Sequence, residues 1–531
     1  MAQRLFSKLS AEMNKKIYWL TFSLVVLLGI FLNFYRLRET QNFFWDVARD
    51  MEVVRKMIVD HKWTLLGPTS SIGFGSQQES YFGPFYYYLI YPALILSKLD
   101  PVGPAYLTAI FGTSAAVLLY FFLLKLTHHR WLSLLGLFIY LISPLSVEYS
   151  RFPWNPNFIS FFVILLLIIV EAFLRKGKML LVLGIGFISG LIFQLHYISM
   201  GIISAIFISL LILKPKKIIL TLFNFVFGFV VGIFPLVLFE LRHNFFLTRG
   251  ILKIANSGLS GNAPLFLSFI FNLRSFIGRF FGFDNYSLVK MEKSSSILSL
   301  ALMLISLSLI FLFFYSQRHF KIRKEKQNQI IFVLALSFIL GLLAAASFVK
   351  ASDNPKIEDR YLLPIFPIFL SLFIISLGKL GRLIKNKKKL FLILLIILLP
   401  LSIFALKKDI KIISRIIPID FYHVNLKGAQ QIAQIVADDV KENKFEGKFN
   451  VANIVDGNTR ATYYRYFLNV LGVKPLAVEA YPQTKVLYVI SLKSKEQTLI
   501  YPVWEINSFA PKKIAKEWGT DFDVKIYRLE N

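Results

Sequence analysis

The sequence predicts a polytopic, mainly α-helical membrane protein that ends in a small α/β domain. Of its 531 residues, 56% are hydrophobic, and 54 are Phe. A helix needs about 20 consecutive apolar residues to cross a bilayer, and a chain made of such runs belongs to the polytopic class. The apolar runs lie near residues 17–35, 105–124, 131–147, 157–174, 179–195, 197–213, 218–239, 297–315, 330–349, 361–378 and 389–406. We therefore expect eleven transmembrane helices.

Loops rich in Lys and Arg alternate along the chain with loops of balanced charge, and this alternation predicts the orientation. With a cytoplasmic N-terminus, the inner segments hold 23 Lys and Arg against two acidic residues. The outer segments 36–104 and 350–360 carry equal numbers of basic and acidic residues. Lys and Arg are retained on the cytoplasmic side of a membrane. We expect a multi-pass protein of the plasma (inner) membrane with a cytoplasmic N-terminus and, after an odd number of spans, an extracytoplasmic C-terminus.

The composition also excludes several classes of function. The net charge of +29 lies in short blocks between apolar runs, whereas a nucleic-acid binder gathers its charge in one stripe or domain. The chain has no cysteine, so disulfides, thiolate chemistry and Cys-ligated metals are excluded. The basic stretch before residue 17 is charged like a signal peptide, but no small-residue cleavage site follows the apolar run, so we expect a retained first span.

The last 125 residues, 407–531, have a different pattern from the rest of the chain. Helical and strand-like segments alternate there, which is typical of a small α/β domain. These segments are Lys427–Asn443, Phe449–Asp456, Thr459–Gly472, Val486–Ser491 and Val524–Leu529. We expect two domains: a membrane domain at 1–406, with outer loops at 36–104 and 240–296, and an extracytoplasmic α/β domain at 407–531.

Three further outer segments have patterns that can be interpreted. Tyr81–Leu99 is apolar but short and interrupted by Pro84 and Pro92, so we expect it at the outer interface. Pro264–Phe283 has the pattern of an amphipathic helix lying on the membrane. The aromatic run Tyr463–Phe467 has helical spacing that favours a core position, with carbohydrate contact as the alternative.

A pair of acidic residues follows the first apolar run. Asp46 and Asp50 are four residues apart, so they share one face of a helix, and Arg49 lies beside that face. In such a group one carboxylate can take a proton while a guanidinium holds a phosphate. The alternative is a solvated first helical turn, where acidic residues are favourable near the helix N-terminus.

The run from Asp46 to Met57 resembles the first-loop motif of the protein O-mannosyltransferase and lipid A aminoarabinose transferase superfamily. That motif is Asp-Glu-x-Arg-x-x-Glu, and Asp46, Arg49 and Glu52 match it. Val47 replaces its second acid. Further resemblances follow in the family's order at Tyr81–Leu89, Ser143–Arg151 and Arg360–Pro367, and together they cover roughly residues 17–406.

This resemblance implies a GT-C fold, in which outer loops above a helical bundle form a cavity for a polyprenyl-phosphate sugar. It also implies an acid in the first outer loop that acts as general base on the acceptor, and Asp46 occupies that position. One departure lies at Gly83, where many members carry a charged pair. We expect no metal cofactor, because no ligand set is visible in the sequence.

Several polar and aromatic residues are candidates for the substrate cavity. His196 lies between two apolar runs, where a polar group is costly unless paired, so we expect it in the donor cavity. The alternative is a histidine that only bridges two helix ends. The guanidinium of Arg360 can bind a phosphate through two N–H groups, and the alternative is an ion pair with the neighbouring acidic residues. Trp154 and Asn155 belong to a turn that suits sugar hydroxyls or caps a helix. The remaining candidates are Asp50, Glu52, Tyr86, Gln194 and Tyr361.

We therefore expect an inverting glycosyltransferase that uses a polyprenyl-phosphate sugar. Asp46 would deprotonate an acceptor hydroxyl, and Arg49 and Arg360 would stabilise the departing phosphate. The expected partners are the lipid-linked sugar, an acceptor that is a protein, lipid or glycan, and membrane lipids, without nucleic acid. Two alternatives are a transporter or flippase of lipid-linked glycans, which would show repeats and acids within its spans, and a polymerase or ligase of such glycans.

Overall fold

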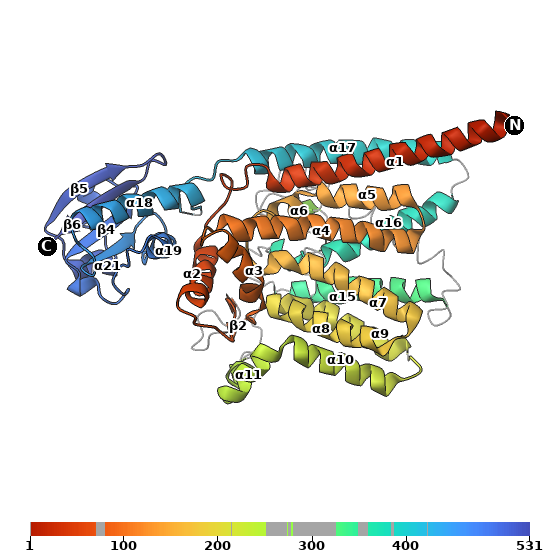
Figure 1. Cartoon of the computed structure of the whole chain (residues 1–531), viewed down its shortest axis with the longest axis horizontal. Coiled ribbons are helices and arrows are strands. Elements are labelled where there is room, and N and C mark those ends of the chain that lie inside the picture. Colours follow the sequence, from red (N-terminus) through yellow and green to blue (C-terminus); the bar gives the residue numbers. More distant parts are fainter. Residues whose placement is uncertain are drawn as a thin grey trace.

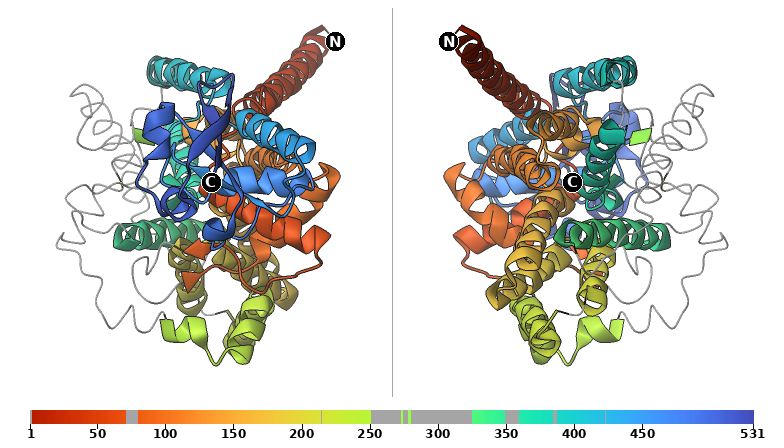
Figure 2. Two further views of the ribbon diagram at one scale, coloured as in Figure 1. Left: turned by 90° about the vertical axis from the view of Figure 1, so that its left-hand side faces the viewer. Right: turned by 90° about the vertical axis from the view of Figure 1, so that its right-hand side faces the viewer.

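The computed structural model describes residues 2–70, 80–213, 215–250, 273, 278–279, 325–348, 359–383, 387–421 and 423–531. Figure 1 shows a bundle of roughly parallel and antiparallel helices with a small sheet domain at one end. The views in Figure 2 look along the bundle from its two ends. The expected span at 297–315 and most of the expected amphipathic helix at 264–283 lie outside the described residues.

Apolar helices make up the bundle. They are α1 (Ala2–Phe34), α4 (Val102–Thr127), α5 (Arg130–Leu141), α7 (Ile159–Lys176), α8 (Met179–Leu195), α9 (Met200–Leu213), α10 (Ile218–Gly232), α15 (Lys326–Phe348), α16 (Phe366–Leu383) and α17 (Lys387–Ser414). Large apolar side chains on α1 point outward, with Leu20 62% and Leu27 59% exposed. An apolar outer surface of this kind is typical of a helix that faces lipid or another apolar surface.

By length and composition, four helices of the described part can each cross a membrane. They are α1, α4, α15 and the continuous stretch Asn155–Lys176 that contains α7. Most of the other bundle helices are shorter or bent, so the number of eleven spans stays a prediction. α17 continues to Ser414, past the expected end of the membrane domain at residue 406, and the division into domains stays a prediction.

Two expected spans are interrupted by proline. The run at 131–147 forms α5 and then a short helix, α6 (Pro144–Tyr149), with Pro144 in its first turn. The run at 218–239 forms α10 and then α11 (Phe234–Arg242), which is bent away by 71°. Pro235 lies in the first turn of α11. Proline starts helices well but cannot donate the hydrogen bond that a continuous helix requires, so each run is divided where its proline occurs.

Helices α8 and α10 pack against each other through glycines. A Cβ atom on Gly190 would lie 2.8 Å from the Cα of Gly232, and one on Gly228 would lie 2.2 Å from the carbonyl oxygen of Leu183. Small residues let membrane helices approach closely. Beside these glycines, Gln194 Nε2 donates a hydrogen bond of 2.5 Å to the Gly232 carbonyl. We call this contact the glycine seam.

The segment after α6 is held by Arg151, which is 4% exposed. Its guanidinium donates hydrogen bonds of 2.6 Å to the Leu32 carbonyl and 2.8 Å to the Tyr35 carbonyl, at the end of α1. The last carbonyls of a helix have no intrahelical donor, so Arg151 supplies one. The resemblance at Ser143–Arg151 therefore corresponds to a structural contact between α6 and α1.

Short elements cover the end of the bundle that faces the sheet domain (Figure 1). They are α2 (Trp45–Val59), the strands β1 (Thr69–Ser70) and β2 (Ser80–Tyr81), and α3 (Phe85–Leu96). α3 has 12 residues, which is about 18 Å of helix and less than the roughly 30 Å of a bilayer core. It contributes buried tyrosines, among them Tyr86 and Tyr87, to the packing against α2.

The C-terminal domain contains a four-stranded sheet with the order β3-β4-β6-β5. Its elements are α18 (Leu426–Glu442), β3 (Phe449–Asn453), α19 (Thr462–Val470), β4 (Val486–Ser491), α20 (Lys495–Leu499), α21 (Trp504–Phe509), β5 (Lys513–Gly519) and β6 (Lys525–Glu530). β3 and β4 are parallel, and β6 is antiparallel to both β4 and β5. The predicted α/β domain is confirmed.

The aromatic run of α19 belongs to the core, as predicted. Tyr464 and Tyr466 are 1% and 0% exposed, which argues against the alternative of carbohydrate contact. Arg465 in the same helix donates to the Leu476 carbonyl at 2.8 Å and to Asn450 of β3. The run therefore joins α19 to the sheet.

Helix α19 also packs on α2, and this contact docks the C-terminal domain on the membrane domain. Phe43, immediately before α2, is fully buried, with its ring centroid 5.7 Å from Tyr466 and 5.1 Å from Phe467. Asn469 Nδ2 donates to Glu52 Oε1 at 3.2 Å. The backbone N–H of Phe43 donates to the Val424 carbonyl at 2.7 Å. α2 is thus held between the bundle and the C-terminal domain.

We expect Phe43→Ala to lower the thermal midpoint of the protein, because it leaves a cavity at this contact. Truncating a buried Phe costs about 3 to 5 kcal/mol. Scanning fluorimetry of the full chain in detergent measures the effect. Phe421, 61% exposed, provides a matched control, and Phe421→Ala should leave the midpoint nearly unchanged. Equal shifts for the two variants would contradict a docked interface at Phe43.

Candidate functional site

A small polar hollow lies where α2 meets the bundle. Its lining comes from five separate parts of the sequence: the first turn of α2, the β1–β2 pair, the turn before α7, the segment around residue 196 and the segment around residue 360. The lining residues are Asp46, Arg49, Thr69, Phe82, Trp154, Asn155, Pro156, His196 and Arg360. The cavity volume is about 20 Å³, so in this conformation it has room for about one water molecule.

The acidic side of the hollow is the first turn of α2. Asp46 is about one-third exposed and lies 3.0 Å from Arg49 Nη1. The same Nη1 donates to the hydroxyl of Thr69 in β1 at 2.7 Å. Arg49 also holds Asp50 Oδ1, with Nη2 at 2.9 Å and Nε at 3.0 Å. One guanidinium therefore orients two carboxylates, of which only Asp46 faces the hollow.

Asp50 is fully buried behind Arg49. Tyr87 donates its hydroxyl to Asp50 Oδ1 at 2.9 Å, while Oδ2 has no partner among the described residues. Burial raises the pKa of Asp50 to about 7, and the facing Arg49 only partly offsets this. A buried carboxyl is costly to ionise, so this group changes charge near neutral pH.

The cationic side of the hollow is Arg360. Its guanidinium carbon lies 5.0 Å from the ring centroid of Trp154 and 5.3 Å from that of Tyr361. Its Nε is buried and makes no hydrogen bond within the described residues. Arginine often stacks on aromatic rings and keeps its N–H groups free for an anion. Such a side chain is prepared for a phosphate or carboxylate ligand.

His196 forms the inner wall of the hollow. The backbone N–H of Ile198 donates to its Nδ1 at 3.2 Å, and its ring packs 4.9 Å from Phe82 and 5.6 Å from Tyr361, measured between centroids. Burial lowers the pKa of His196 to about 3, helped by the charge of Arg360. The imidazole is therefore neutral, and since Nδ1 accepts, Nε2 carries the proton and can donate it.

Asn155 fixes the turn that carries Trp154. Its Nδ2 donates to the Leu195 carbonyl at 2.6 Å, and the residue is 3% exposed. The turn between Pro153 and Pro156 is thereby attached to the end of α8. Asn155 lines the hollow, but its amide nitrogen already has a protein partner.

Several predicted cavity residues lie elsewhere. Glu52 is not in the hollow: it pairs with Arg55 at 2.8 Å and accepts from Asn469, because six residues after Asp46 it faces the C-terminal domain. Gln194 is not in the hollow either, since its amide joins the backbones of Phe85 and Gly232. Asp50, Tyr86 and Tyr361 lie behind the lining residues without forming it.

The sequence did not indicate three of the lining residues, and it did not explain why Gly83 departs from the family pattern. Thr69, Phe82 and Pro156 line the hollow. Phe82 lies within the Tyr81–Leu89 resemblance, which could have indicated it, whereas no sequence signal marks Thr69. A Cβ atom on Gly83 would lie 2.3 Å from Gln194 Oε1. Glycine therefore stands at 83 because Gln194 fills the adjacent space.

The described ranges contain no group of three His, Asp or Glu side chains arranged to hold a metal ion. The expectation of no metal cofactor rests on the sequence and stays a prediction. The two acids nearest the hollow are both engaged by Arg49.

The architecture is similar to that of solved structures of ArnT from Cupriavidus metallidurans. The structure of ArnT bound to undecaprenyl phosphate matches with a TM-score of 0.56 and 11% identity, over 96% of this chain and 98% of that chain. The apo structure matches with a TM-score of 0.55 and 12% identity, over 97% and 98%. The chain has the fold of ArnT. The predicted GT-C fold is therefore confirmed. No family model and no curated protein sequence matches the chain.

Proposed function

We propose that the protein is an integral-membrane glycosyltransferase that moves a sugar from a polyprenyl-phosphate donor to an acceptor hydroxyl. The observation that carries the proposal is the hollow itself, in which the carboxylate of Asp46 shares one lining with the guanidinium groups of Arg49 and Arg360. The ArnT-like architecture, with undecaprenyl phosphate bound to ArnT in one of the two structures, supports a lipid-linked phosphate as the donor.

The arrangement supplies the groups that an inverting transfer needs. The acceptor oxygen bonds to the anomeric carbon while the bond from that carbon to the phosphate oxygen breaks. The acceptor proton passes to Asp46, and the polyprenyl phosphate leaves as an anion that needs no proton. Arg49 and Arg360 stabilise the charge that gathers on the phosphate. Nε2 of the neutral His196 can donate to a sugar hydroxyl or to the phosphate.

The orientation predicted from loop charge puts this chemistry on the extracytoplasmic side. The first turn of α2 lines the hollow, and α2 lies at the end of the bundle that faces the C-terminal domain (Figure 1). Basic residues at the end of α7 and just before α10 lie at the other end of the bundle. This separation of charge is the one expected for a site on the outer face.

Binding of undecaprenyl phosphate tests the donor class directly. We expect undecaprenyl phosphate added to the purified protein in nanodiscs to raise its thermal midpoint, because a ligand that binds only the folded state stabilises it. Undecaprenol, which has the same chain without the phosphate, should have little effect. Equal shifts with both lipids would show that the phosphate is not recognised, and the proposed donor class would be wrong.

The pKa of Asp50 predicts a pH dependence of donor binding. As pH falls through about 7, Asp50 becomes neutral, and Arg49 loses one of its two counter-charges. The KM for the donor should therefore fall between about pH 8 and pH 6. Asp50→Asn should give the low KM at both pH values. The raised pKa also means that Asp50 contributes stability at low pH, and that this contribution is lost as pH rises through about 7.

Initial rates at several donor concentrations across this pH range provide the measurement. Asp60, at the C-terminal end of the same helix, provides the control. Asp60→Asn should keep the pH dependence of the wild-type protein. If KM in Asp50→Asn still changed with pH as in the wild type, Asp50 would not be the titrating group.

A further inference from the structure

A second cavity lies at the end of the bundle opposite to the hollow. It has a volume of about 490 Å³ and lies between the ends of α7 and α9 and the beginnings of α8 and α15. α7 begins next to the turn that carries Asn155 and ends at this cavity after 18 residues. At 1.5 Å per residue this is about 27 Å, so the two sites are far apart.

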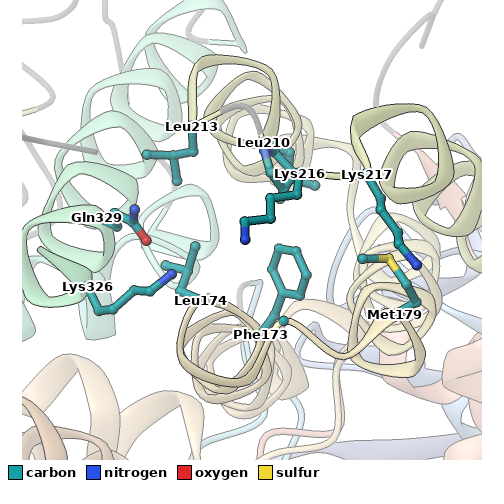
Figure 3. Close-up of a pocket in the computed structure, with 11 residues that line it drawn as sticks. Phe173, Leu174, Met179, Leu210, Leu213, Lys216, Lys217, Lys326 and Gln329 are labelled. Carbon is teal, nitrogen blue, oxygen red and sulfur yellow. The ribbon is translucent and has the colours of Figure 1, made fainter. Parts of the chain in front are cut away.

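Lysines dominate the polar side of this cavity, which we call the lysine pocket. Lys216, Lys217 and Lys326 line it, and none of the other described residues that line it is acidic. Figure 3 shows the ammonium groups of Lys216 and Lys326 turned into the pocket from opposite sides, with the amide of Gln329 beside them, while Lys217 points toward Met179. Two like charges that face one another across a cavity are favourable when an anion lies between them.

The remaining walls are apolar. Phe173 and Leu174 come from α7, Leu210 and Leu213 from α9, and Met179 from the start of α8. A free inorganic anion has no apolar part that could contact such walls. A molecule with a charged head and a hydrocarbon tail matches both sides of the pocket, and the lipid that surrounds the bundle supplies such molecules.

We propose that the lysine pocket binds the phosphate headgroup of an anionic phospholipid, with the first acyl carbons against the apolar walls. Basic pockets between transmembrane helices bind anionic lipid headgroups. Here Lys216 and Lys326 hold the phosphate, and the lipid joins α7, α9 and α15 at the end of the bundle where no sugar is transferred. The site is independent of the donor chemistry at the hollow.

The test compares lipids and variants with the purified full-length protein. Phosphatidylglycerol is titrated into the protein in phosphatidylcholine nanodiscs, and bound phosphatidylglycerol is counted by native mass spectrometry. We expect saturable binding to the wild type. The double variant Lys216→Gln/Lys326→Gln should bind about 30-fold more weakly, which corresponds to about 1 kcal/mol for each lysine.

Two further variants separate the pocket from general surface charge. Lys176→Gln/Lys178→Gln removes two exposed charges from the same end of the bundle, at residues that do not line the pocket, and should bind almost as well as the wild type. Leu213→Trp keeps every charge but fills the pocket, and it should weaken binding. Equal losses in the two lysine pairs would overturn the proposal. Thermal stabilisation by inorganic phosphate as strong as that by phosphatidylglycerol would overturn it too, because the ligand would then be a free anion.

Discussion

Asp46→Asn is expected to lower kcat for sugar transfer by about 10³-fold, because a positioned general base contributes roughly 10² to 10⁴ to a rate. Asn has the shape of Asp but cannot take the acceptor proton. The KM for the donor should change much less than kcat, and downward, since Arg49 keeps its contacts with Asp50 and Thr69 but loses the charge of Asp46. Initial rates with a lipid-linked sugar and a saturating acceptor measure both constants.

Asp60→Asn is the matched control for this variant. Asp60 follows the same helix and lies outside the hollow, so its replacement should leave kcat unchanged. Undiminished transfer by Asp46→Asn would remove the general base from the proposal and favour a polymerase or ligase. Absence of transfer in the wild-type protein itself would favour a flippase.

Arg360→Gln is expected to raise the KM for the donor by about 10- to 100-fold, because a charged hydrogen bond contributes roughly 1.5 to 3 kcal/mol. The side chain is already stacked on Trp154, and its Nε has no partner in the part of the chain that the structure describes, so little conformational entropy is lost when a phosphate binds. Arg360→Lys should recover only part of the affinity, since an ammonium group cannot bind a phosphate in the bidentate manner of a guanidinium.

Arg242 provides the control for charge alone. It is exposed at the end of α11 and does not line the hollow, so Arg242→Gln should leave KM near the wild-type value. A similar rise in KM for both arginine variants would show that Arg360 acts only through the overall charge of the outer face. An unchanged KM in Arg360→Gln would show that Arg360 does not hold the donor.

Much of the fold could be predicted from the sequence, because the helix and strand periods are strong. The strand prediction at Val486–Ser491 matches β4 residue for residue. The break at Ser143 and the bend at Ile233 were missed, since an apolar run has nearly the same composition whether or not a proline divides it. β5 was missed too: Lys513–Gly519 is a half-exposed strand with charged residues, which gives a weak hydrophobic pattern.

The site was harder to predict than the fold. Asp46, Arg49, Asn155, His196 and Arg360 do line one hollow, and the ordered resemblance of their segments to one family is the sequence signal that groups them. Glu52 belongs to the same motif as Asp46, and Gln194 lies two residues before His196. Both nevertheless make hydrogen bonds outside the hollow that join parts of the fold. A sequence shows which polar residues lie near a cavity, but the direction of each side chain depends on helix rotation and on neighbours that are far away in the chain.

The glycine seam limits which wall of the hollow can move to make room for a molecule the size of a sugar phosphate. The cavity of about 20 Å³ is too small for one, so some wall must move. The side behind His196 and Asn155 is tied to α8, and α8 cannot separate from α10 without losing the Gly190–Gly232 contact and the Gln194 hydrogen bond. That side is therefore expected to stay rigid, so the space that the proposed donor needs must open on the side of the β1–β2 pair.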